Sequence, residues 1–388
     1  MKKLAIITTH PIQYYAPVFS LLAKNRSIGI KVFYTGGDIV IKKQDPGFGK
    51  MIEWDIPLLD GYQYEFITNI SKNPGSHLFN GIKNPELASK IEFYKPDAIL
   101  VFGWAYHSHL KMLMHFKGKI PIWFRGDSTL LNENIGITGV LKSMLKKIFL
   151  NWVYKHVDNA FYVGENNRSY LQAYGLETKQ LIFAPHAVDN KRFSVDRLEE
   201  AFQLRKSLNI PESSTVILFA GKLERIKNPL LLIRALSNLK PGNNCHLIIA
   251  GNGELEQALK LRAQSNKIHF LNFQNQSQMP VLYQACDLFC LPSKSESWGL
   301  AVNEAMACSR AVLVSDKVGC ATDLVIPNVN GQIFKSGNLN DLTEKLFELT
   351  NDQFRLKEMG QRSKEIIHSF NFEKIASAIE KQLLLSGI

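Results

Sequence analysis

The sequence lacks several features that would each have indicated a class of protein. None of its five cysteines forms a Cys-x-x-Cys pair, and most lie in apolar runs such as "ACDLFCLPS", so buried thiols are expected rather than disulfides or zinc ligands. No stretch reaches the roughly 18 consecutive apolar residues of a spanning helix. The opening "MKKLAIITTHP" has only a short apolar run and no small-residue cleavage site. We interpret it as a first buried strand rather than a signal peptide.

Two further absences concern ligand classes. The first expected strand is followed by "TTHPIQYY", without the Gly-x-Gly-x-x-Gly of a nicotinamide-dependent dehydrogenase. Aromatic residues are not interleaved with basic ones in a sheet-like recognition motif, so the net charge of +11 does not predict nucleic-acid binding. The charge still favours acidic partners such as phosphorylated metabolites or anionic lipid.

What is present is a chain of 388 residues, long enough that two domains are the default expectation. Near-continuous apolar segments alternate with helical patterns, which predicts parallel sheets covered by helices on both faces. The alternation stops near Pro185 and starts again after Pro211, with a charged connector between them. We predict an α/β protein of two doubly wound, Rossmann-like domains, residues 1–190 and 191–369, facing a deep cleft. Ligands should bind at the carboxyl ends of the strands.

Two strand exits in the second half carry groups suited to phosphate. The segment "AGKLERIKNP" places Lys222 and Lys227 before a helix that Pro229 helps to start, and cations beside a helix start form a site for a diphosphate. In "AGNGELEQAL", Gly251 and Gly253 permit close approach of backbone to a ligand. A plain tight turn is an equally good interpretation of that loop, since a single Gly-x-Gly is a weak signal.

The stretch "LPSKSESWGLAVNEAMACS" contains two glutamates, Glu296 and Glu304, in an otherwise apolar region. Acids are seldom buried without partners. Glu296 lies in a Ser/Gly-rich loop and Glu304 lies about one turn into the helix that follows, whose start favours an anion. If the ligand is a nucleotide sugar, the two acids would bind sugar hydroxyls on one side of the anion and ribose hydroxyls on the other.

These segments together resemble the donor-binding domain of glycosyltransferase family 4, which comprises retaining enzymes of the GT-B fold. The similar stretches include "AGKLERIKNPLLLIRAL", "IAGNGELEQALK", "ACDLFCLPSKSESWGLAVNEAMACSRAVLVSD" and "NGQIF". The closing "FNFEKIASAIEKQLL" resembles the family's C-terminal helix, which implies that residues 370–388 cross back to pack on the first domain. The resemblance covers nearly the whole chain.

The resemblance implies roles for individual residues. Glu296 would contact the donor sugar, Glu304 the ribose, and Lys222 and Lys227 the departing diphosphate. The residues expected to take part in catalysis are Lys222, Lys227, Glu296, Arg125 and Asp127. The residues implied in donor binding are Lys222, Lys227, Gly251, Gly253, Phe273, Glu296, Trp298, Gly299, Leu300 and Glu304. No Asp-x-Asp motif occurs in a fitting position, so no cofactor and no metal are expected, and the cations would supply the charge stabilisation.

The acceptor is expected at strand exits of the first half, in "THPIQYYAPVF", "FGWAYHSHLKML" and "WFRGDSTLL". Arg125 would bind an acidic acceptor or the donor phosphate, and Asp127 would accept a hydrogen bond from the acceptor hydroxyl. The predicted acceptor-side residues are His10, Gln13, Tyr14, Tyr15, His107, Arg125 and Asp127. In "DPGFGKMIEWDIPLLDGY", the residues Asp45, Gly47, Gly49, Trp54 and Asp55 are either acceptor-site elements or an ordinary surface loop anchored by its tryptophan.

The segment "GVLKSMLKKIFLNWVYKH" is basic and amphipathic, and residues Ala105–Lys155 hold eight Lys/Arg against two Asp/Glu. It predicts either a helix on anionic lipid near a lipid-linked acceptor or a helix packed on the sheet with solvated lysines. We favour the packed helix, because every helix of such a domain needs an apolar face.

The function predicted from the sequence is that of a retaining glycosyltransferase. It would use a UDP or GDP sugar and a sugar or lipid-linked saccharide acceptor, in the cytoplasm or at the inner face of the cell membrane, in the synthesis of a bacterial surface polysaccharide or glycoconjugate. A nucleotide-sugar epimerase of the same architecture and a non-catalytic nucleotide-sugar-binding protein are the alternatives.

Overall fold

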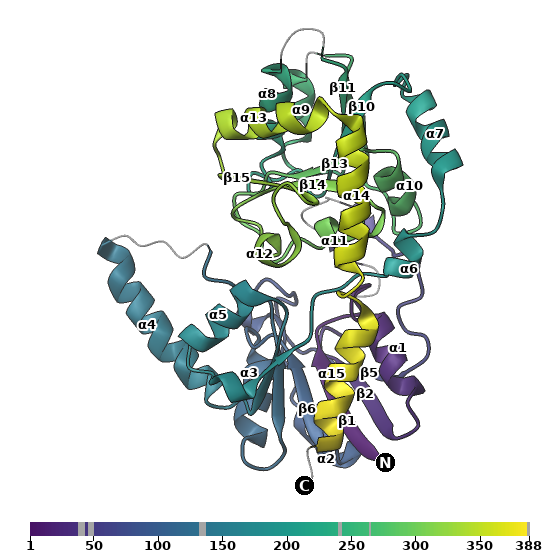
Figure 1. Ribbon diagram of the computed structural model, residues 1–388. Coiled ribbons are helices and arrows are strands. Elements are labelled where there is room, and N and C mark those ends of the chain that lie inside the picture. Colours follow the sequence, from purple (N-terminus) through teal and green to yellow (C-terminus); the bar gives the residue numbers. More distant parts are fainter. Residues whose placement is uncertain (38–42, 46–49, 132–136, 240–242, 264, 386–388) are drawn as a thin grey trace. The chain divides into compact units, whose positions relative to one another are not determined.

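The computed structural model describes residues 1–37, 43–45, 50–131, 137–239, 243–263 and 265–385. The chain forms two compact units (Figure 1). The first unit consists of Met1–Lys43, Pro57–Pro185 and Phe372–Ile388, and the second of Gln44–Ile56 and His186–Asn371. Residues 44–56 therefore belong to the second unit, although the sequence analysis places them in the first domain.

The first unit is built on a seven-stranded sheet in which each described pair of neighbouring strands is parallel. The strand order is β5-β2-β1-β6-β7-β8-β9. The strands are β1 (Lys2–Thr8), β2 (Ile28–Tyr34), β5 (Gln63–Phe66), β6 (Ala98–Phe102), β7 (Ile122–Arg125), β8 (Asn159–Tyr162) and β9 (Leu181–Phe183). All five residues of β6 are buried, as expected for a central strand covered on both faces.

The helices of the first unit are α1 (Ala16–Lys24), α2 (Leu87–Tyr94), α3 (His107–Phe116), α4 (Ile137–Tyr154), α5 (Glu165–Ala173) and α15 (Phe372–Leu385), with short 3-10 turns at Phe79–Gly81 and Thr178–Gln180. α15 packs against α1 and β1 (Figure 1). It buries Ile375, Ile379 and Leu383, which recur at the spacing of one helix face. The predicted return of the C-terminal helix to the first domain is confirmed.

Helix α4 differs from the favoured expectation. Of its side chains that the structure describes, from residue 142 onward, the buried ones are near its end and include Leu150, Val153 and Tyr154. The side chains of residues 142–149 are all exposed. With 3.6 residues per turn, Leu145, Ile148 and Trp152 lie on the face opposite Leu150 and Val153. The prediction that the apolar face packs on the sheet is therefore wrong for this part of the helix.

The second unit is built on a six-stranded parallel sheet with the order β12-β11-β10-β13-β14-β15. Its strands are β10 (Thr215–Ala220), β11 (Cys245–Ala250), β12 (Ile268–Leu271), β13 (Leu288–Leu291), β14 (Ala311–Ser315) and β15 (Gly331–Phe334). A separate two-stranded pair is formed by β3 (Lys43–Asp45) and β4 (Lys50–Ile52). All six residues of β10 and all six of β11 are buried.

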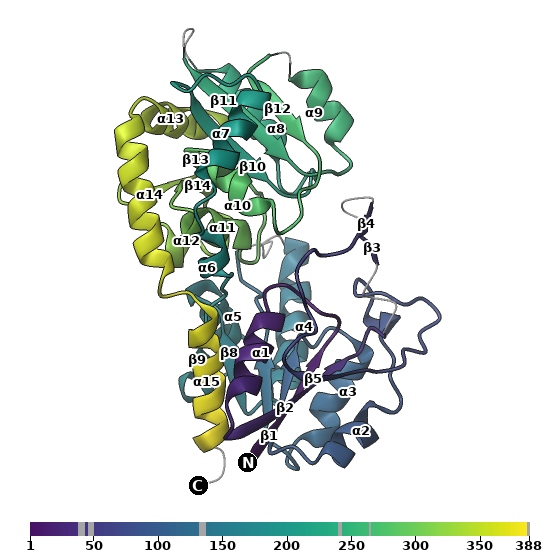
Figure 2. The same cartoon turned by 90° about the vertical axis from the view of Figure 1, so that its right-hand side faces the viewer.

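The helices of the second unit are α6 (Asn190–Phe193), α7 (Leu198–Ser207), α8 (Pro229–Ser237), α9 (Glu256–Arg262), α10 (Met279–Gln284), α11 (Leu300–Ala307), α12 (Ala321–Leu324), α13 (Leu339–Thr350) and α14 (Gln353–Ile367). α13 packs on β15 and α14 on β14, and Figure 2 shows α14 beside β14. α11 packs on β13 and β14 and against α10. The sheet is thus covered by helices, as its apolar strands require.

Both sheets have a point at which the strand order reverses. In the second sheet it lies between β10 and β13, and in the first between β1 and β6. Ligands of doubly wound sheets bind outside the carboxyl ends of the strands at such points. The predicted fold class, two Rossmann-like α/β domains, is confirmed.

Candidate functional site

The reversal point of the second sheet is flanked by the loop after β10 and the loop after β13. Lys227 is in the first loop and Glu296 in the second, and the Lys227 ammonium forms an ion pair with the Glu296 carboxylate. Their side chains are 23% and 16% exposed, so the pair is reachable from solvent but shielded enough for its charges to interact strongly. Two predicted site residues separated by 69 positions are therefore brought together.

The loop that carries Glu296 is held by backbone hydrogen bonds to the segment after β14. The Glu296 amide donates to the Lys317 carbonyl at 3.0 Å, and the Gly319 amide donates to the Glu296 carbonyl at 3.0 Å. A Cβ on Gly319 would lie only 1.8 Å from the Ser297 carbonyl oxygen. Gly319 is thus required for this close approach, a role that the sequence analysis missed because the glycine lies outside the segment that carries the two glutamates.

Helix α11 begins beside the ion pair. Gly299 precedes it with φ of 100°, a left-handed conformation that favours glycine, and Leu300 is its first residue. The Trp298 indole is buried and donates to the Asn303 side-chain oxygen at 2.9 Å. Asn303 in turn donates to the His186 carbonyl at 3.1 Å. The Trp298 side chain therefore fixes the helix start, and the predicted contact of its backbone with a ligand stays a prediction.

Glu304 lies in the second turn of α11 and is 3% exposed. Its carboxylate accepts a hydrogen bond from the Tyr283 hydroxyl of α10 at 2.8 Å. A buried carboxylate oriented by a phenol is a rigid hydrogen-bond acceptor. The predicted ribose contact of Glu304 stays a prediction, and Tyr283 is a residue of the site that sequence reasoning did not identify.

The two glycines of the loop after β11 have a packing function. Gly251 and Gly253 have φ of 140° and 158°. Cβ atoms there would lie 2.0 Å from the Gly221 carbonyl oxygen and 2.7 Å from the Leu223 carbonyl oxygen. The loops after β10 and β11 therefore run in backbone contact, with the Leu223 amide donating to the Asn252 carbonyl at 3.0 Å. Lys222 lies on the same half-buried loop, and its role and those of the two glycines toward a ligand stay predictions.

In the first unit, Tyr15, Arg125 and Asp127 come together at the carboxyl ends of the strands. The Arg125 guanidinium carbon lies 5.9 Å from the centroid of the Tyr15 ring. Burial raises the pKa of Tyr15 to about 12, which Arg125 opposes and Asp127 reinforces. Asp127 is half-buried, which leaves it accessible for the predicted hydrogen bond from an acceptor hydroxyl.

Arg125 itself has a different surrounding from the one predicted. It is 1% exposed, and its two terminal nitrogens donate to the carbonyls of Ala184 and Pro185 at 2.7 and 2.9 Å. The guanidinium fork is thus used to fix the chain where it leaves β9. We therefore revise the prediction that Arg125 binds an acceptor or phosphate, and assign it a structural function.

The other predicted acceptor-side residues surround the reversal point of the first sheet. His10, Gln13 and Tyr14 are half-buried between β1 and α1, and His10 Nδ1 shares a hydrogen bond with the Thr9 hydroxyl at 2.7 Å. His107 is the first residue of α3. Burial, with Lys83 and Lys111 nearby, lowers the pKa of its imidazole. Two residues considered for the acceptor site, Gly47 and Gly49, lie outside the described residues.

His109 gives a prediction for acid stability. It is fully buried, shares a hydrogen bond with the Thr35 hydroxyl at 2.8 Å, and burial lowers its pKa from 6.5 to about 4. Between these values the unfolded chain binds a proton that the folded protein does not, so acid favours unfolding. We expect the free energy of unfolding to fall by roughly 3 kcal/mol through this group from pH 6.5 to pH 4.

Urea unfolding at several pH values tests the contribution of His109. His109→Gln should flatten the dependence in this window, whereas His77→Gln at an exposed position should leave it unchanged. An equal slope in the wild type and in His109→Gln would contradict the prediction.

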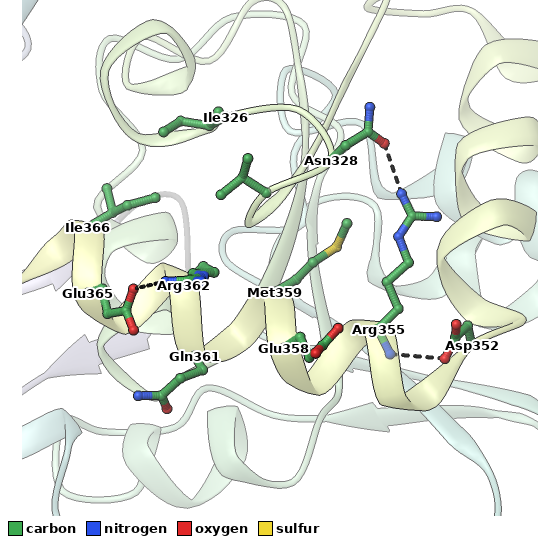
Figure 3. A pocket seen from close by; sticks show the side chains of 11 residues that line it. Ile326, Asn328, Asp352, Arg355, Glu358, Met359, Gln361, Arg362, Glu365 and Ile366 are labelled. Atoms are coloured by element: carbon green, nitrogen blue, oxygen red, sulfur yellow. Dashed lines mark hydrogen bonds and ion pairs between the residues drawn. The ribbon is translucent and has the colours of Figure 1, made fainter.

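A groove of about 1020 Å³ lies along α14 (Figure 3). Its charged side chains bond to neighbours within it: Arg355 donates to the Asn328 side-chain oxygen at 2.9 Å, and Arg362 donates to Glu365 at 2.8 Å. Asn328 precedes β15 and thus lies at the amino end of that strand, opposite the edge that holds Lys227 and Glu296. This groove is not part of the candidate site.

Three further properties concern the described residues. Among them, no three His, Cys, Asp or Glu side chains are grouped so as to hold a metal ion. No described helix is long and apolar enough to cross a membrane. All five cysteines are free and buried, in agreement with the expectation of buried thiols, and burial raises the pKa of Cys286 to about 12.

The second unit contains a segment that is similar to a known family of proteins. Residues 200–366 match the family described as "Glycosyl transferases group 1". The chain is 28% identical over 221 residues to a D-inositol 3-phosphate glycosyltransferase of Nocardia farcinica, covering 54% of this chain and 48% of the relative. It is 28% identical over 246 residues to an N,N'-diacetylbacillosaminyl-diphospho-undecaprenol alpha-1,3-N-acetylgalactosaminyltransferase of Campylobacter jejuni, covering 61% and 63%. The chain spans about half the length of the first curated relatives it matches.

Solved structures match the whole chain. Sucrose-phosphate synthase from Thermosynechococcus elongatus has a TM-score of 0.75 at 18% identity, with both chains covered completely. The chain has the GT-B fold. HepE from Anabaena, solved in complex with UDP and glucose, gives a TM-score of 0.71 at 17% identity and covers 99% of this chain and 100% of its own. At such identities the structures establish the GT-B fold alone.

Proposed function

We propose that this protein is a retaining glycosyltransferase that moves a sugar from a nucleoside-diphosphate sugar to an acceptor hydroxyl. The observation that carries the proposal is the Lys227–Glu296 pair at the reversal point of the second sheet, within the segment that matches the group 1 glycosyltransferases. A UDP or GDP sugar is the proposed donor, and the UDP and glucose bound to HepE, a protein of the same fold, support the choice of UDP.

The residues at this point have complementary tasks in the proposed reaction. The Lys227 ammonium would leave Glu296 for the diphosphate and stabilise the charge that develops as the sugar departs. The freed Glu296 carboxylate would accept hydrogen bonds from sugar hydroxyls. The Glu304 carboxylate would accept them from the ribose hydroxyls. Lys222 and the amides at the start of α11 would add positive potential. Because Lys222, Lys227 and the amides at the start of α11 are preorganised and supply the positive potential, the proposal includes no metal ion and no cofactor.

Retention of configuration is proposed to occur by substitution on one face of the sugar. A double displacement would need a carboxylate as nucleophile, whereas in the proposed complex the Glu296 carboxylate accepts hydrogen bonds from the sugar hydroxyls, and Glu304 is 3% exposed and bonded to Tyr283. In the proposed step the acceptor oxygen bonds to the anomeric carbon while the bond to the diphosphate breaks, and the diphosphate takes the acceptor's proton. Asp127 would orient the acceptor hydroxyl as a hydrogen-bond acceptor.

The donor site is tested by thermal unfolding with UDP, GDP, ADP, dTDP and CDP, with and without magnesium. A ligand at a hundred times its dissociation constant adds about 2.7 kcal/mol to stability. We expect one nucleotide to raise Tm without magnesium, and the shift to be lost in Glu304→Gln, which keeps the shape of the side chain. No shift with any nucleotide would overturn the proposal.

Product analysis separates this function from the alternative enzyme. Incubated with the nucleotide sugar and an acceptor mixture, a transferase releases nucleoside diphosphate. An epimerase would return an isomeric nucleotide sugar and release none. The name of the Campylobacter relative includes a diphospho-undecaprenol carrier, so lipid-linked saccharides are the first acceptors to test.

Peripheral contact with the inner face of an anionic membrane is part of the proposal, and helix α4 supports it. Its outward side chains are 40 to 63% exposed, and they are Met144, Leu145, Ile148, Phe149 and Trp152. Lys142 and Lys147 accompany them, and Ile137–Tyr154 contains no acid. Lys146 instead lies over the Tyr170 and Tyr174 rings, and Phe149 also contacts Trp104. A helix with a large apolar face and flanking lysines lies in the headgroup region of anionic lipid.

Co-sedimentation with vesicles tests this contact. The wild type should bind phosphatidylglycerol-containing vesicles and not pure phosphatidylcholine. The Leu145→Gln/Ile148→Gln double variant should bind at least about tenfold more weakly, because each buried aliphatic side chain contributes about 1.5–3 kcal/mol. Phe93→Gln, at an 89% exposed position on α2, is the control. If the wild type does not bind vesicles but forms a dimer, and the double variant does not dimerise, the exposed face of α4 is the contact with a second copy of the chain instead.

A further inference from the structure

The segment that ends at Ile56 belongs to the second unit and is hydrogen-bonded there to the loop after β12. The Asn275 side chain donates to the Glu53 carbonyl at 2.8 Å. The Ser277 amide donates to the Asp55 carboxylate at 3.1 and 3.2 Å, and the Ser277 hydroxyl also donates to it. These bonds hold the chain on both sides of Trp54, so the position of the indole is set by the second unit.

Trp54 lies against Phe273, the second residue after β12. The ring centroids are 6.2 Å apart and the planes are tilted by 59°, a favourable arrangement for an aromatic pair. Both side chains are half-buried, so part of their aromatic surface stays accessible. Trp54 was considered above as an acceptor-site element. Its contact with Phe273 places it instead beside the loop after β12.

Phe273 is fixed to the loop after β11. Its amide donates to the Asn252 side-chain oxygen at 2.8 Å, and the Asn252 amide group donates to the Asn272 side-chain oxygen at 3.1 Å. The Asn252 carbonyl accepts from Leu223 in the loop after β10. The loops after β10, β11 and β12 therefore form one continuous edge that runs from the loop of Lys227 to the Trp54–Phe273 pair.

The distance along this edge suits a nucleoside. β12 is two strands away from β10, and strands are spaced by about 4.8 Å, so the aromatic pair lies on the order of 10 Å from the loop of Lys227. That is about the reach from a diphosphate through ribose to a base. A base has a flat π-face that stacks on aromatic side chains and gains about 1–3 kcal/mol in doing so.

We propose that Trp54, together with Phe273, binds the nucleobase of the donor, and that residues 53–55 thereby contribute to base selectivity. This inference rests on the proposed function, because it assumes that a diphosphate binds at Lys227. Asp55 acts as a positioning residue: it touches no ligand but anchors the segment to Ser277. This assignment gives a side chain from the N-terminal part of the chain a direct contact with the base.

The test compares a nucleoside diphosphate with inorganic pyrophosphate, which lacks the base. Calorimetry would measure the Kd of both for the wild type, Trp54→Ala, Trp54→Phe and the control Phe93→Ala. We expect Trp54→Ala to raise the Kd of the nucleoside diphosphate by roughly 5- to 150-fold, while the Kd of pyrophosphate stays within about twofold. Trp54→Phe retains an aromatic face and should recover most of the affinity, which excludes misfolding as the cause.

The possible results distinguish a failure of the proposed base site at Trp54 from a failure of the proposed donor site. If Trp54→Ala leaves the nucleoside diphosphate bound as tightly as in the wild type, the base site is wrong although the donor site stands. If the variant loses pyrophosphate and nucleotide equally, Trp54 only supports the fold, and the inference is also wrong. A wild type that binds no nucleotide would overturn the proposed function and this inference with it.

Discussion

Lys227→Ala is expected to weaken binding of the donor's nucleoside diphosphate by roughly 10- to 150-fold, about 1.5–3 kcal/mol, the range for a hydrogen bond to a charged group. Two effects act in the same direction. The diphosphate loses its cation, and the Glu296 carboxylate, 16% exposed, keeps a negative charge beside the ligand without the ammonium that balances it. Titration calorimetry with the nucleotide selected by thermal unfolding measures the change.

Two further variants make this prediction specific. Arg225→Ala removes a cation two residues away whose side chain is 87% exposed, and should change Kd by less than about twofold because exposed charges are screened. In Lys227→Ala/Glu296→Gln the uncompensated charge is gone, so part of the affinity should return. A loss of equal size in Arg225→Ala would show that overall charge, not the ion pair at the reversal point, determines binding.

Gly319→Ala is expected to have the second large effect, on both stability and the donor site. The added methyl would lie 1.8 Å from the Ser297 carbonyl oxygen, far inside any contact distance, so one of two backbone segments must move. The hydrogen bonds between Glu296, Lys317 and Gly319 would lengthen or break. We expect a loss of at least about 2 kcal/mol in the free energy of unfolding, as for other overpacked buried sites.

Gly29→Ala is the matched control. A Cβ there would lie closest to the flexible end of the Met1 side chain, at 3.1 Å, and at an ordinary contact distance of 3.7 Å from the Tyr94 hydroxyl, so the free energy of unfolding should change by less than about 1 kcal/mol. Urea unfolding measures stability, and nucleotide binding below the transition reports on the site. If Gly319→Ala is as stable as the wild type and binds nucleotide normally, the loop is less constrained than these contacts indicate.

The sequence predicted the elements whose pattern is set by burial. The central strands β1, β6, β10 and β11 were expected because they are apolar on both faces. β5 was not, since Gln63–Phe66 is a short edge strand with two exposed residues, and edges carry little periodic signal. For α4, the alternative with an exposed apolar face was considered but not favoured, because a periodic pattern shows that a face exists and not what it contacts.

For the candidate site, the residues that a sequence motif contains were predictable, whereas those that support them were not. Lys227 and Glu296 were identified from loops at strand ends, and the structure pairs them. Tyr283, Asn303 and Gly319 act through tertiary contacts, which leave no local signature. For Arg125, the carbonyl partners at Ala184 and Pro185 favour a structural function, which the sequence around an arginine at a strand end does not indicate.

The discontinuous first unit has a consequence for synthesis of the protein on the ribosome. α15, near the end of the chain, supplies Ile375, Ile379 and Leu383 to the surface formed by α1 and β1. Those apolar positions stay uncovered while the 186 residues from His186 to Asn371 are translated. Until α15 emerges from the ribosome, the first unit is nearly complete but exposes this apolar surface. Such exposed surface favours aggregation, which chaperones prevent. Loss of the last turns of α15 should thus reduce yield in the cell more than it reduces nucleotide affinity in the molecules that do fold.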